Sequence, residues 1–145
     1  MLLTGDLQAV TETFGVDVFG PLRGRAFAPI LAANNGGVVN MRSRLSWLAG
    51  SAHWAPEAAA WSVTNSLRLE LVPQNTQVVG VHAGFIDTDM ASAIERPKTA
   101  AAAISARIVD SFEGGDVEVL ADDVTVTLKA ALSGPVEQLT FSAAS

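Results

Sequence analysis

Residues 34–41, Asn-Asn-Gly-Gly-Val-Val-Asn-Met, decide the fold. The Asn and Gly residues break the preceding pattern, and 38–41 is a short apolar run typical of a buried strand. A helical pattern follows over 52–72 and stops at Pro73, because the residue before a proline avoids helical geometry. A second strand pattern covers 76–82. A strand, a helix and a strand in this order predict a parallel β-α-β unit with a right-handed crossover.

The same alternation continues toward the C-terminus. A helix is predicted over 99–113, stopped by two glycines and followed by a strand at 116–120. A last helix is predicted from Asp122 to Gly134. The pattern predicts an α/β fold with about three parallel strands and four to five helices.

One domain is expected over 1–135, followed by a C-terminal tail at 136–145. Helical spacing also covers 6–33, but Gly15, Gly20, Pro21 and Gly24 argue against one straight helix there. These glycines and the proline predict that the N-terminal helical region is interrupted.

Composition excludes several classes of function. The net charge is −6 and the nine basic residues are scattered, so nucleic acid is not an expected partner. The chain has no cysteine, which excludes disulfides and thiolate zinc sites and is typical of a cytoplasmic protein. No signal peptide and no membrane span are expected. With 49% hydrophobic and only 17% charged residues, part of the surface is expected to meet a second subunit.

Four blocks carry a family resemblance. They are DVFGPLRGRAFAPIL, GGVVNMRSRLSWLAG, EAAAWSVTNSLRLEL and TQVVGVHAGFIDTDM. In this order they resemble the C-terminal part of a short-chain dehydrogenase/reductase, from near the N-terminus to about Pro135. The resemblance implies a truncated Rossmann-like three-layer unit that is completed by dimerisation. The family's glycine-rich nucleotide-binding turn is not matched, and that turn holds the pyrophosphate at a helix N-terminus. We therefore expect no tight binding of NAD(P) by this chain alone.

The resemblance also places the family's catalytic residues, which are Asn, Ser and Tyr-x-x-x-Lys. Asp17 stands at the Asn position, Ser43 at the Ser position, and His53 and Glu57 at the Tyr and Lys positions. Only Ser43 keeps the family's residue. The family's reaction needs a phenol activated by an ammonium group, whereas Glu57 would favour a protonated His53.

These residues instead suggest an enzyme without cofactor or metal. Ser43 as nucleophile, His53 as general base, and Glu57 or Asp17 orienting the imidazole are the parts needed for acyl transfer. The leading hypothesis is therefore an esterase-like hydrolase, or a related acid/base catalyst, that acts on a small apolar substrate. Ser43 is not on a Gly-x-Ser-x-Gly turn, which argues against this hypothesis.

Two alternatives stay open. One is a non-catalytic binding protein, in which His53 and Glu57 are a solvated pair at a helix N-terminus. The other is a residual NAD(P)-dependent oxidoreductase whose missing half is supplied by another chain. His82 is expected to be a core residue, and the three tryptophans are expected to pack in the core or in a dimer interface.

A homodimer is predicted in either case. The strand at 38–41 would have an exposed apolar edge, which must be covered by edge pairing, helix exchange or packing of the long helices. Arg42 and Ser43 alternate along this strand, so only one of the two is expected to face a pocket.

Overall fold

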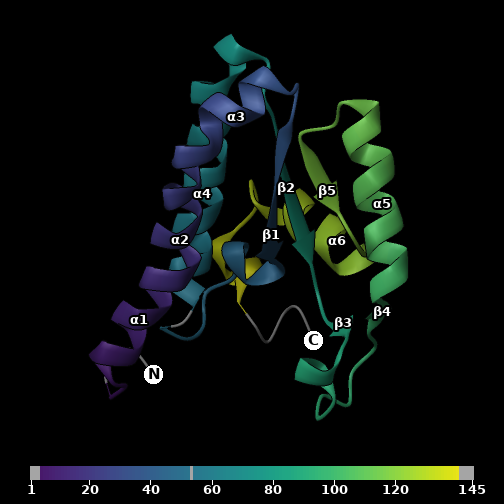
Figure 1. Ribbon diagram of the computed structural model, residues 1–145. Coiled ribbons are helices and arrows are strands. Elements are labelled where there is room, and N and C mark those ends of the chain that lie inside the picture. The colour runs from purple at the N-terminus through teal and green to yellow at the C-terminus, as the bar shows by residue number, and fades with distance from the viewer. Residues whose placement is uncertain (1–3, 53, 141–145) are drawn as a thin grey trace.

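A three-stranded parallel sheet forms the centre of the molecule in a computed structural model that describes residues 4–52 and 54–140. Its strands, in the order β1-β2-β5, are β1 (Gly37–Ser43), β2 (Gln77–Ala83) and β5 (Glu118–Leu120). β1 and β2 pair over their whole length, with Ser43 opposite Ala83 at the carboxyl ends. The predicted parallel α/β unit is therefore confirmed (Figure 1).

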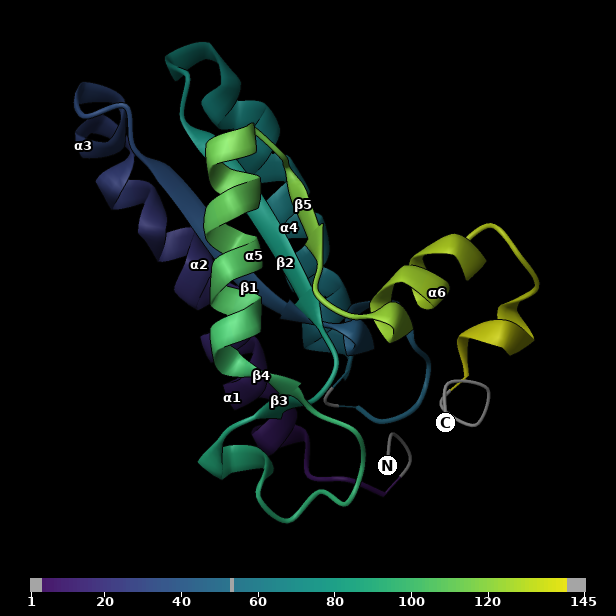
Figure 2. The ribbon, with the colours of Figure 1, turned by 90° about the vertical axis from the view of Figure 1, so that its right-hand side faces the viewer.

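Helices cover both faces of the sheet. The longer ones are α1 (Leu7–Asp17), α4 (Trp54–Leu71), α5 (Ala101–Gly114) and α6 (Asp123–Ala131). α4 packs on β1 and β2 with α1 beside it, whereas α5 lies on the opposite face and α6 follows the end of β5 (Figures 1 and 2). Within the described part of the chain, no helix is both long enough and apolar enough to cross a membrane.

The N-terminal helical region is interrupted, as predicted. After α1 the chain forms α2 (Phe19–Arg23), a 3-10 turn at Gly24–Phe27, and α3 (Ala28–Ala33). Pro21 lies inside α2, where it cannot donate a backbone hydrogen bond. The region therefore forms short pieces instead of one straight helix, and α1 is the piece that packs on α4.

Pro56 shows why α4 begins where it does. It is the third residue of α4, within the first turn, where backbone N–H groups have no intrahelical partner. At the other end α4 gives way to a 3-10 turn at Val72–Gln74, which contains Pro73. Asn75 closes this turn with a left-handed backbone (φ 57°), and β2 follows. Both ends agree with the helix predicted from the proline positions.

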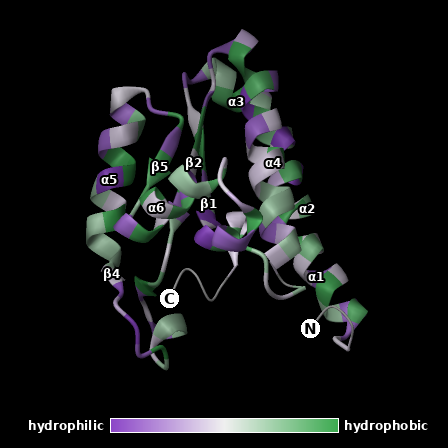
Figure 3. Ribbon diagram, turned by 180° about the vertical axis from the view of Figure 1, so that it is seen from behind, coloured by the Kyte–Doolittle hydropathy of each residue, from purple (hydrophilic) through white to green (hydrophobic). Residues whose placement is uncertain are grey.

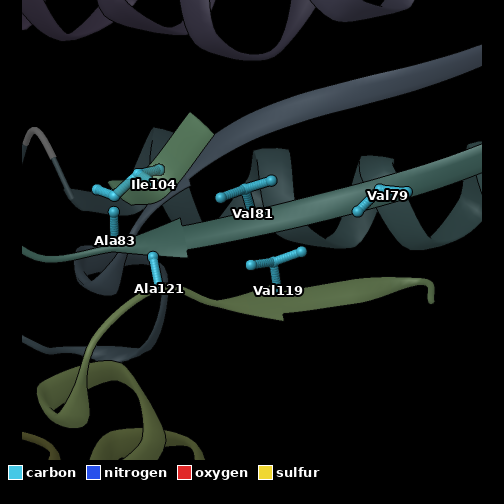
Figure 4. Close-up of a cluster of buried hydrophobic side chains, with 6 residues drawn as sticks. All are labelled: Val79, Val81, Ala83, Ile104, Val119 and Ala121. Atoms are coloured by element: carbon cyan, nitrogen blue, oxygen red, sulfur yellow. The ribbon is translucent and has the colours of Figure 1, made fainter. Parts of the chain in front are cut away.

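The main core lies between the sheet and α5. Its members are the buried side chains of Val79, Val81, Ala83, Ile104, Val119 and Ala121 (Figure 4). Each fully buried valine contributes about 1.5–3 kcal/mol relative to an exposed one. Gly37 at the start of β1 lies against the ring of Phe112, where a Cβ atom would clash. The sheet and α5 therefore approach most closely at this glycine.

A second, two-residue parallel pairing was not predicted. β3 (Ile86–Asp87) pairs with β4 (Thr99–Ala100), and the N–H of Thr99 donates to the carbonyl of Phe85 over 2.8 Å. Two residues are too few for a detectable period of apolar side chains. The pairing closes the loop between β2 and α5 into a compact lobe beside the strand ends (Figure 2).

The first strand has an open edge among the described residues. β1 pairs only with β2, and Val39 and Met41 remain 39% and 43% exposed. The apolar edge predicted for 38–41 is therefore present. The predicted tail from residue 136 contains a 3-10 turn at Val136–Leu139, whose last carbonyl accepts the N–H of Ala49 over 2.8 Å.

Candidate functional site

A hollow lies at the carboxyl ends of β1 and β2, among the described residues. We call this cavity of about 740 Å³ the strand-end cleft. Ligands of open α/β sheets bind at this edge, because the loops that follow the strands converge there. Residues that line the strand-end cleft include Met41, Arg42, Ser43, Glu57, Phe85 and Met90.

Ser43 ends β1 and caps the short 3-10 turn that follows. Its Oγ accepts a hydrogen bond from the N–H of Leu45 over 3.2 Å. A hydroxyl that accepts in this way keeps its own proton for donation elsewhere. Because Ser43 lines the strand-end cleft, that proton is available to a ligand oxygen.

Glu57 reaches the same strand end from the first turn of α4. Its Oε2 accepts the backbone N–H of Ser43 over 3.3 Å. Burial raises the pKa of Glu57 above its ordinary value, and the carboxylate of Asp17 raises it further. The N–H of Ser43 and the guanidinium of Arg42 oppose this shift without cancelling it. Glu57 therefore carries a proton at a higher pH than an exposed glutamate does.

Arg42 connects the cleft to α1. Its Nη1 donates to the backbone carbonyl of Asp17 over 3.1 Å, and its buried Nε has no hydrogen-bond partner. The main chain of Asp17, and not its carboxylate, thus makes the contact. Arg42 and Ser43 both belong to the residues that line the strand-end cleft, and the side chain of Arg42 is bonded to the backbone of Asp17.

The four predicted catalytic residues are therefore only partly brought together. Ser43 and Glu57 are in direct contact, and Asp17 joins them through Arg42. His53 lies outside the described residues.

His82 is a core residue, as expected, with neighbours that sequence reasoning missed. Its ring is 1% exposed and stacks on Trp47 with 4.1 Å between ring centres. Its Nε2 lies 3.6 Å from a carboxylate oxygen of Glu118, which also binds Lys129 over 2.7 Å. Burial lowers the pKa of His82 to about 4, although Glu118 opposes the shift. No pattern in the sequence relates these residues, since they lie on different elements.

The tryptophans pack as expected for core residues. Trp47 belongs to a second buried cluster with Leu48 and Leu128, and both Trp54 and Trp61 pack against it. Lys129 places its ammonium 5.2 Å and 5.4 Å from the ring centres of Trp47 and Trp61. This cluster joins α4 to α6 beneath the strand ends.

Arg44 follows Ser43 and begins the 3-10 turn after β1. It is buried, with only 5% of its surface exposed. Its guanidinium carbon lies 4.7 Å from the centre of the Phe85 ring. It lines a smaller cavity of about 210 Å³ next to the strand-end cleft. Arg42 and Arg44, two positions apart in the sequence, therefore line different cavities.

Comparisons with known proteins agree with this geometry. A family model described as enoyl-(acyl carrier protein) reductase matches residues 2–133. The chain is 37% identical over 86 residues to the short-chain dehydrogenase anuB of Penicillium roqueforti, and 35% identical over 89 residues to the short-chain dehydrogenase virD of Hypocrea virens. These matches cover 59% of this chain but only 30% and 31% of those proteins.

Solved structures of a short-chain dehydrogenase and of a putative oxidoreductase are also similar to this chain. A short-chain dehydrogenase from Burkholderia cenocepacia, crystallised with NADP, superposes with a TM-score of 0.84 at 31% identity. The match covers 92% of this chain and 60% of that one. A putative oxidoreductase from Escherichia coli has a TM-score of 0.69 at 25% identity and covers 81% of this chain.

These relatives overturn one prediction. The esterase-like hydrolase inferred from Ser43, His53 and a carboxylate is wrong, because the relatives are dehydrogenases and oxidoreductases and none of those named above is a hydrolase. Side-chain types suited to acyl transfer do not identify it without an oxyanion hole and an exposed nucleophile turn. With the family model matching most of its length, the chain belongs to the short-chain dehydrogenase/reductase family.

Proposed function

We propose that this chain forms the substrate-binding side of an NAD(P)-linked oxidoreductase that acts on an uncharged, largely apolar carbonyl compound or alcohol. The observation that carries the proposal is the strand-end cleft, which has Ser43 and Glu57 in contact on its wall. Family membership supports the class of reaction, and the residues of this chain support the class of substrate.

Ser43 orients the substrate oxygen in this proposal. Its hydroxyl accepts from Leu45, so its proton points to a different acceptor. A carbonyl oxygen in the cleft is such an acceptor, and a hydrogen bond to it stabilises the negative charge that develops during reduction.

Glu57 supplies a proton in the same proposal. An alkoxide formed from a carbonyl needs a general acid, and a carboxyl whose pKa is raised by burial keeps its proton closer to neutral pH. When Glu57 loses that proton, the guanidinium of Arg42 favours the resulting carboxylate. Glu57 and His53 would then act from the positions of the family's Lys and Tyr, with a chemistry different from the phenol and ammonium pair.

The walls of the cleft favour an apolar, uncharged substrate. Met41, Phe85, Met90 and Ile94 contribute apolar side chains, and methionines adapt to irregular shapes. Glu57 and Asp89 are the acidic residues of the wall, and Arg42 is its basic residue. With Glu57 protonated, the charges of Asp89 and Arg42 balance, so the wall has no net positive charge that would attract an anionic substrate.

The described residues do not fit a whole dinucleotide. A pyrophosphate needs a glycine-rich turn at a free helix N-terminus. The first turn of α4 carries Pro56 and Glu57, and the start of α6 is capped by the carboxylate of Asp122. Neither helix start offers the glycine-rich turn with free N–H groups that a pyrophosphate needs, so the phosphates of NAD(P) are not assigned to these residues, and no catalytic step is assigned to the nucleotide here.

Binding of substrate and of nucleotide can be tested separately. Acetophenone, an apolar ketone, should shift the backbone amide resonances of Ser43 and Phe85 in a ¹⁵N NMR titration, and phenylpyruvate should not. NADPH fluorescence should show only weak binding to this chain. Equal binding of the two carbonyl compounds, or shifts remote from the strand ends, would contradict the proposed substrate class.

A homodimer is the second part of the proposal. Large apolar side chains are exposed on the N-terminal helices and on β1, including Phe19, Phe27, Ile30, Val39 and Met41. Figure 3 shows hydrophobic segments along α1 and α2 on the outside of the molecule. Exposed apolar surface of this kind supports association with a second copy.

A further inference from the structure

A small pocket adjoins the strand-end cleft at Ser43. Its volume is about 240 Å³, and we call it the side pocket. Ser43, Gly84 and Phe85 line both cavities. The other residues that line the side pocket are Arg44, Leu45 and Trp54. The serine whose hydroxyl is proposed to bind the substrate oxygen therefore lies between two cavities of different size.

The wall of the side pocket is largely apolar. Leu45, Trp54 and Phe85 are its large apolar residues, and Gly84 adds no side chain. Of the described residues in this wall, Arg44 carries a charge, and its guanidinium carbon lies 4.7 Å from the centre of the Phe85 ring. An aromatic face attracts a cation at this distance, so Phe85 meets the guanidinium. The rest of the wall favours an apolar ligand group.

Gly50 decides where the ring of Trp54 lies. A Cβ atom added at Gly50 would overlap the six-membered part of the indole, so the ring lies directly against the backbone of this glycine. Trp54 is partly buried and also packs against the second buried cluster. Because the ring is in contact on two sides, it forms a fixed wall of the side pocket.

Leu45 is linked to Ser43 by a hydrogen bond. The Oγ of Ser43 accepts the backbone N–H of Leu45 over 3.2 Å, at the start of the 3-10 turn Arg44–Trp47. This bond fixes the distance between the hydroxyl and the wall of the side pocket. A carbonyl carbon has two substituents, so a ketone whose oxygen meets Ser43 can place one substituent in each cavity.

The volumes of the two cavities limit what each can hold. An apolar cavity of about 150 Å³ holds one benzene molecule, and sites for whole small molecules measure about 300–1,000 Å³. The side pocket, at about 240 Å³, is therefore large enough for one phenyl ring or one branched alkyl group but not for a whole ligand. The strand-end cleft, at about 740 Å³, has room for the larger part of the substrate.

We propose that the side pocket binds one apolar substituent of the substrate, a phenyl ring or a branched alkyl group, and that Leu45 and Trp54 set the size of that substituent. This role toward a substrate rests on the function proposed for Ser43. Binding of an apolar ring in the side pocket needs no carbonyl group, so the two proposals can fail separately.

Benzene tests the side pocket without a carbonyl group. Titrated into the ¹⁵N-labelled protein, it should cause saturable shifts of the amide of Leu45 and of the indole N–H of Trp54. Leu45→Phe enlarges a side chain of the wall and should weaken benzene binding at least fivefold. Leu69→Phe makes the same change on α4 at a position that is 75% exposed, and it is the matched control with unchanged binding.

Gly50→Ala is a second variant, which alters the side pocket without replacing a residue of its wall. The added methyl group must displace the ring of Trp54, so benzene binding should again weaken at least fivefold. Gly114→Ala is the control, because a methyl group there meets open space at the end of α5. Unchanged resonances remote from residues 45–54 verify that each variant is folded.

Two ketones connect the side pocket to the proposed reaction. Acetophenone and isobutyrophenone share a phenyl ring, but the second substituent is a methyl group in the first and an isopropyl group in the second. Leu45→Phe should weaken the binding of isobutyrophenone at least fivefold more than that of acetophenone, as followed by the amide shift of Ser43. Equal losses for the two ketones would overturn the role of Leu45 in setting the size of the substituent.

The outcome with benzene is decisive for the site itself. Shifts that never saturate, shifts remote from Leu45 and Trp54, or equal binding by the wild type, Leu45→Phe and Leu69→Phe would overturn the side pocket. Saturable binding of benzene together with no binding of either ketone would support the side pocket and refute the function proposed for Ser43.

Discussion

The carboxylate of Glu57 accepts a hydrogen bond from the backbone N–H of Ser43 over 3.3 Å. This contact joins the first turn of α4 to the end of β1, although the two residues belong to different elements. Both residues line the strand-end cleft, and the N–H of Ser43 opposes the rise in the pKa of Glu57 that burial causes.

Glu57→Gln should change how stability depends on pH. The pKa of Glu57 is raised in the folded protein, so its contribution to stability is fully present below the pKa of the unfolded chain and is lost as pH rises through the folded-state pKa. The amide stays neutral and can still accept from Ser43. Melting curves from pH 4 to 8 should show that the variant gains stability over the wild type as pH rises. Parallel curves would contradict the raised pKa.

Ser43→Ala should weaken the binding of an apolar ketone and lower stability. The variant removes the proton donated to the ketone oxygen, and loss of one such hydrogen bond typically costs about 0.5–1.5 kcal/mol. It also removes the acceptor for the N–H of Leu45, at a cost of about 1 kcal/mol in stability. A ¹⁵N NMR titration with acetophenone and urea unfolding measure the two effects. Ser105→Ala, on the exposed side of α5, is the control and should leave ketone binding unchanged.

His82 should make the protein sensitive to mild acid. Its pKa of about 4 lies below the unfolded value of about 6.5, so its contribution to stability is present above that value and is lost as pH falls toward 4. The contribution of His82 to the stability of the wild type should fall by about 2 kcal/mol between pH 7.5 and pH 5, at about 1.36 kcal/mol per pKa unit. His82→Phe keeps the stack on Trp47 without titrating. Urea unfolding at both pH values should show a clearly smaller loss in the variant.

Val81→Ala tests the core between the sheet and α5. Val81 is fully buried in the cluster with Ile104 and Val119. Removing its two methyl groups loses transfer free energy and leaves a cavity, at a cost of about 2 kcal/mol. Val136→Ala, at a position that is 66% exposed, should change stability by less than about 0.5 kcal/mol. Denaturant unfolding measures both, and equal effects would argue against this packing.

The homodimer should appear as twice the monomer mass in light scattering coupled to gel filtration. Phe27→Glu places a charge on the exposed apolar side of the N-terminal helices, and Val39→Lys places one on the edge strand. Dissociation by the first variant would identify a helical interface, and dissociation by the second an interface through β1. A wild type that remains monomeric at high concentration would contradict the prediction.

The local sequence pattern was sufficient to predict the order of the main helices and strands along the chain. Breaks at Gly36 and Pro73 and the apolar runs between them predicted β1, α4 and β2 in parallel. These signals act within a few residues, since a glycine or proline alters its own backbone and a helix or strand repeats its side chains at a fixed period. The four sequence blocks, taken in order, also predicted the short-chain dehydrogenase/reductase family, which the comparisons support.

Only the tertiary structure decided the environment of each side chain. Glu57 meets Ser43 across 14 residues of sequence, and Arg42 meets Asp17 across 25. The burial of Arg44 beside Phe85 likewise depends on two different strand ends lying together. The prediction of an esterase rested on the residue types Ser, His and carboxylate alone, without the distances between these side chains. Hydrogen bonding and burial depend on distances between elements, and a periodic pattern along the chain contains no information about those distances.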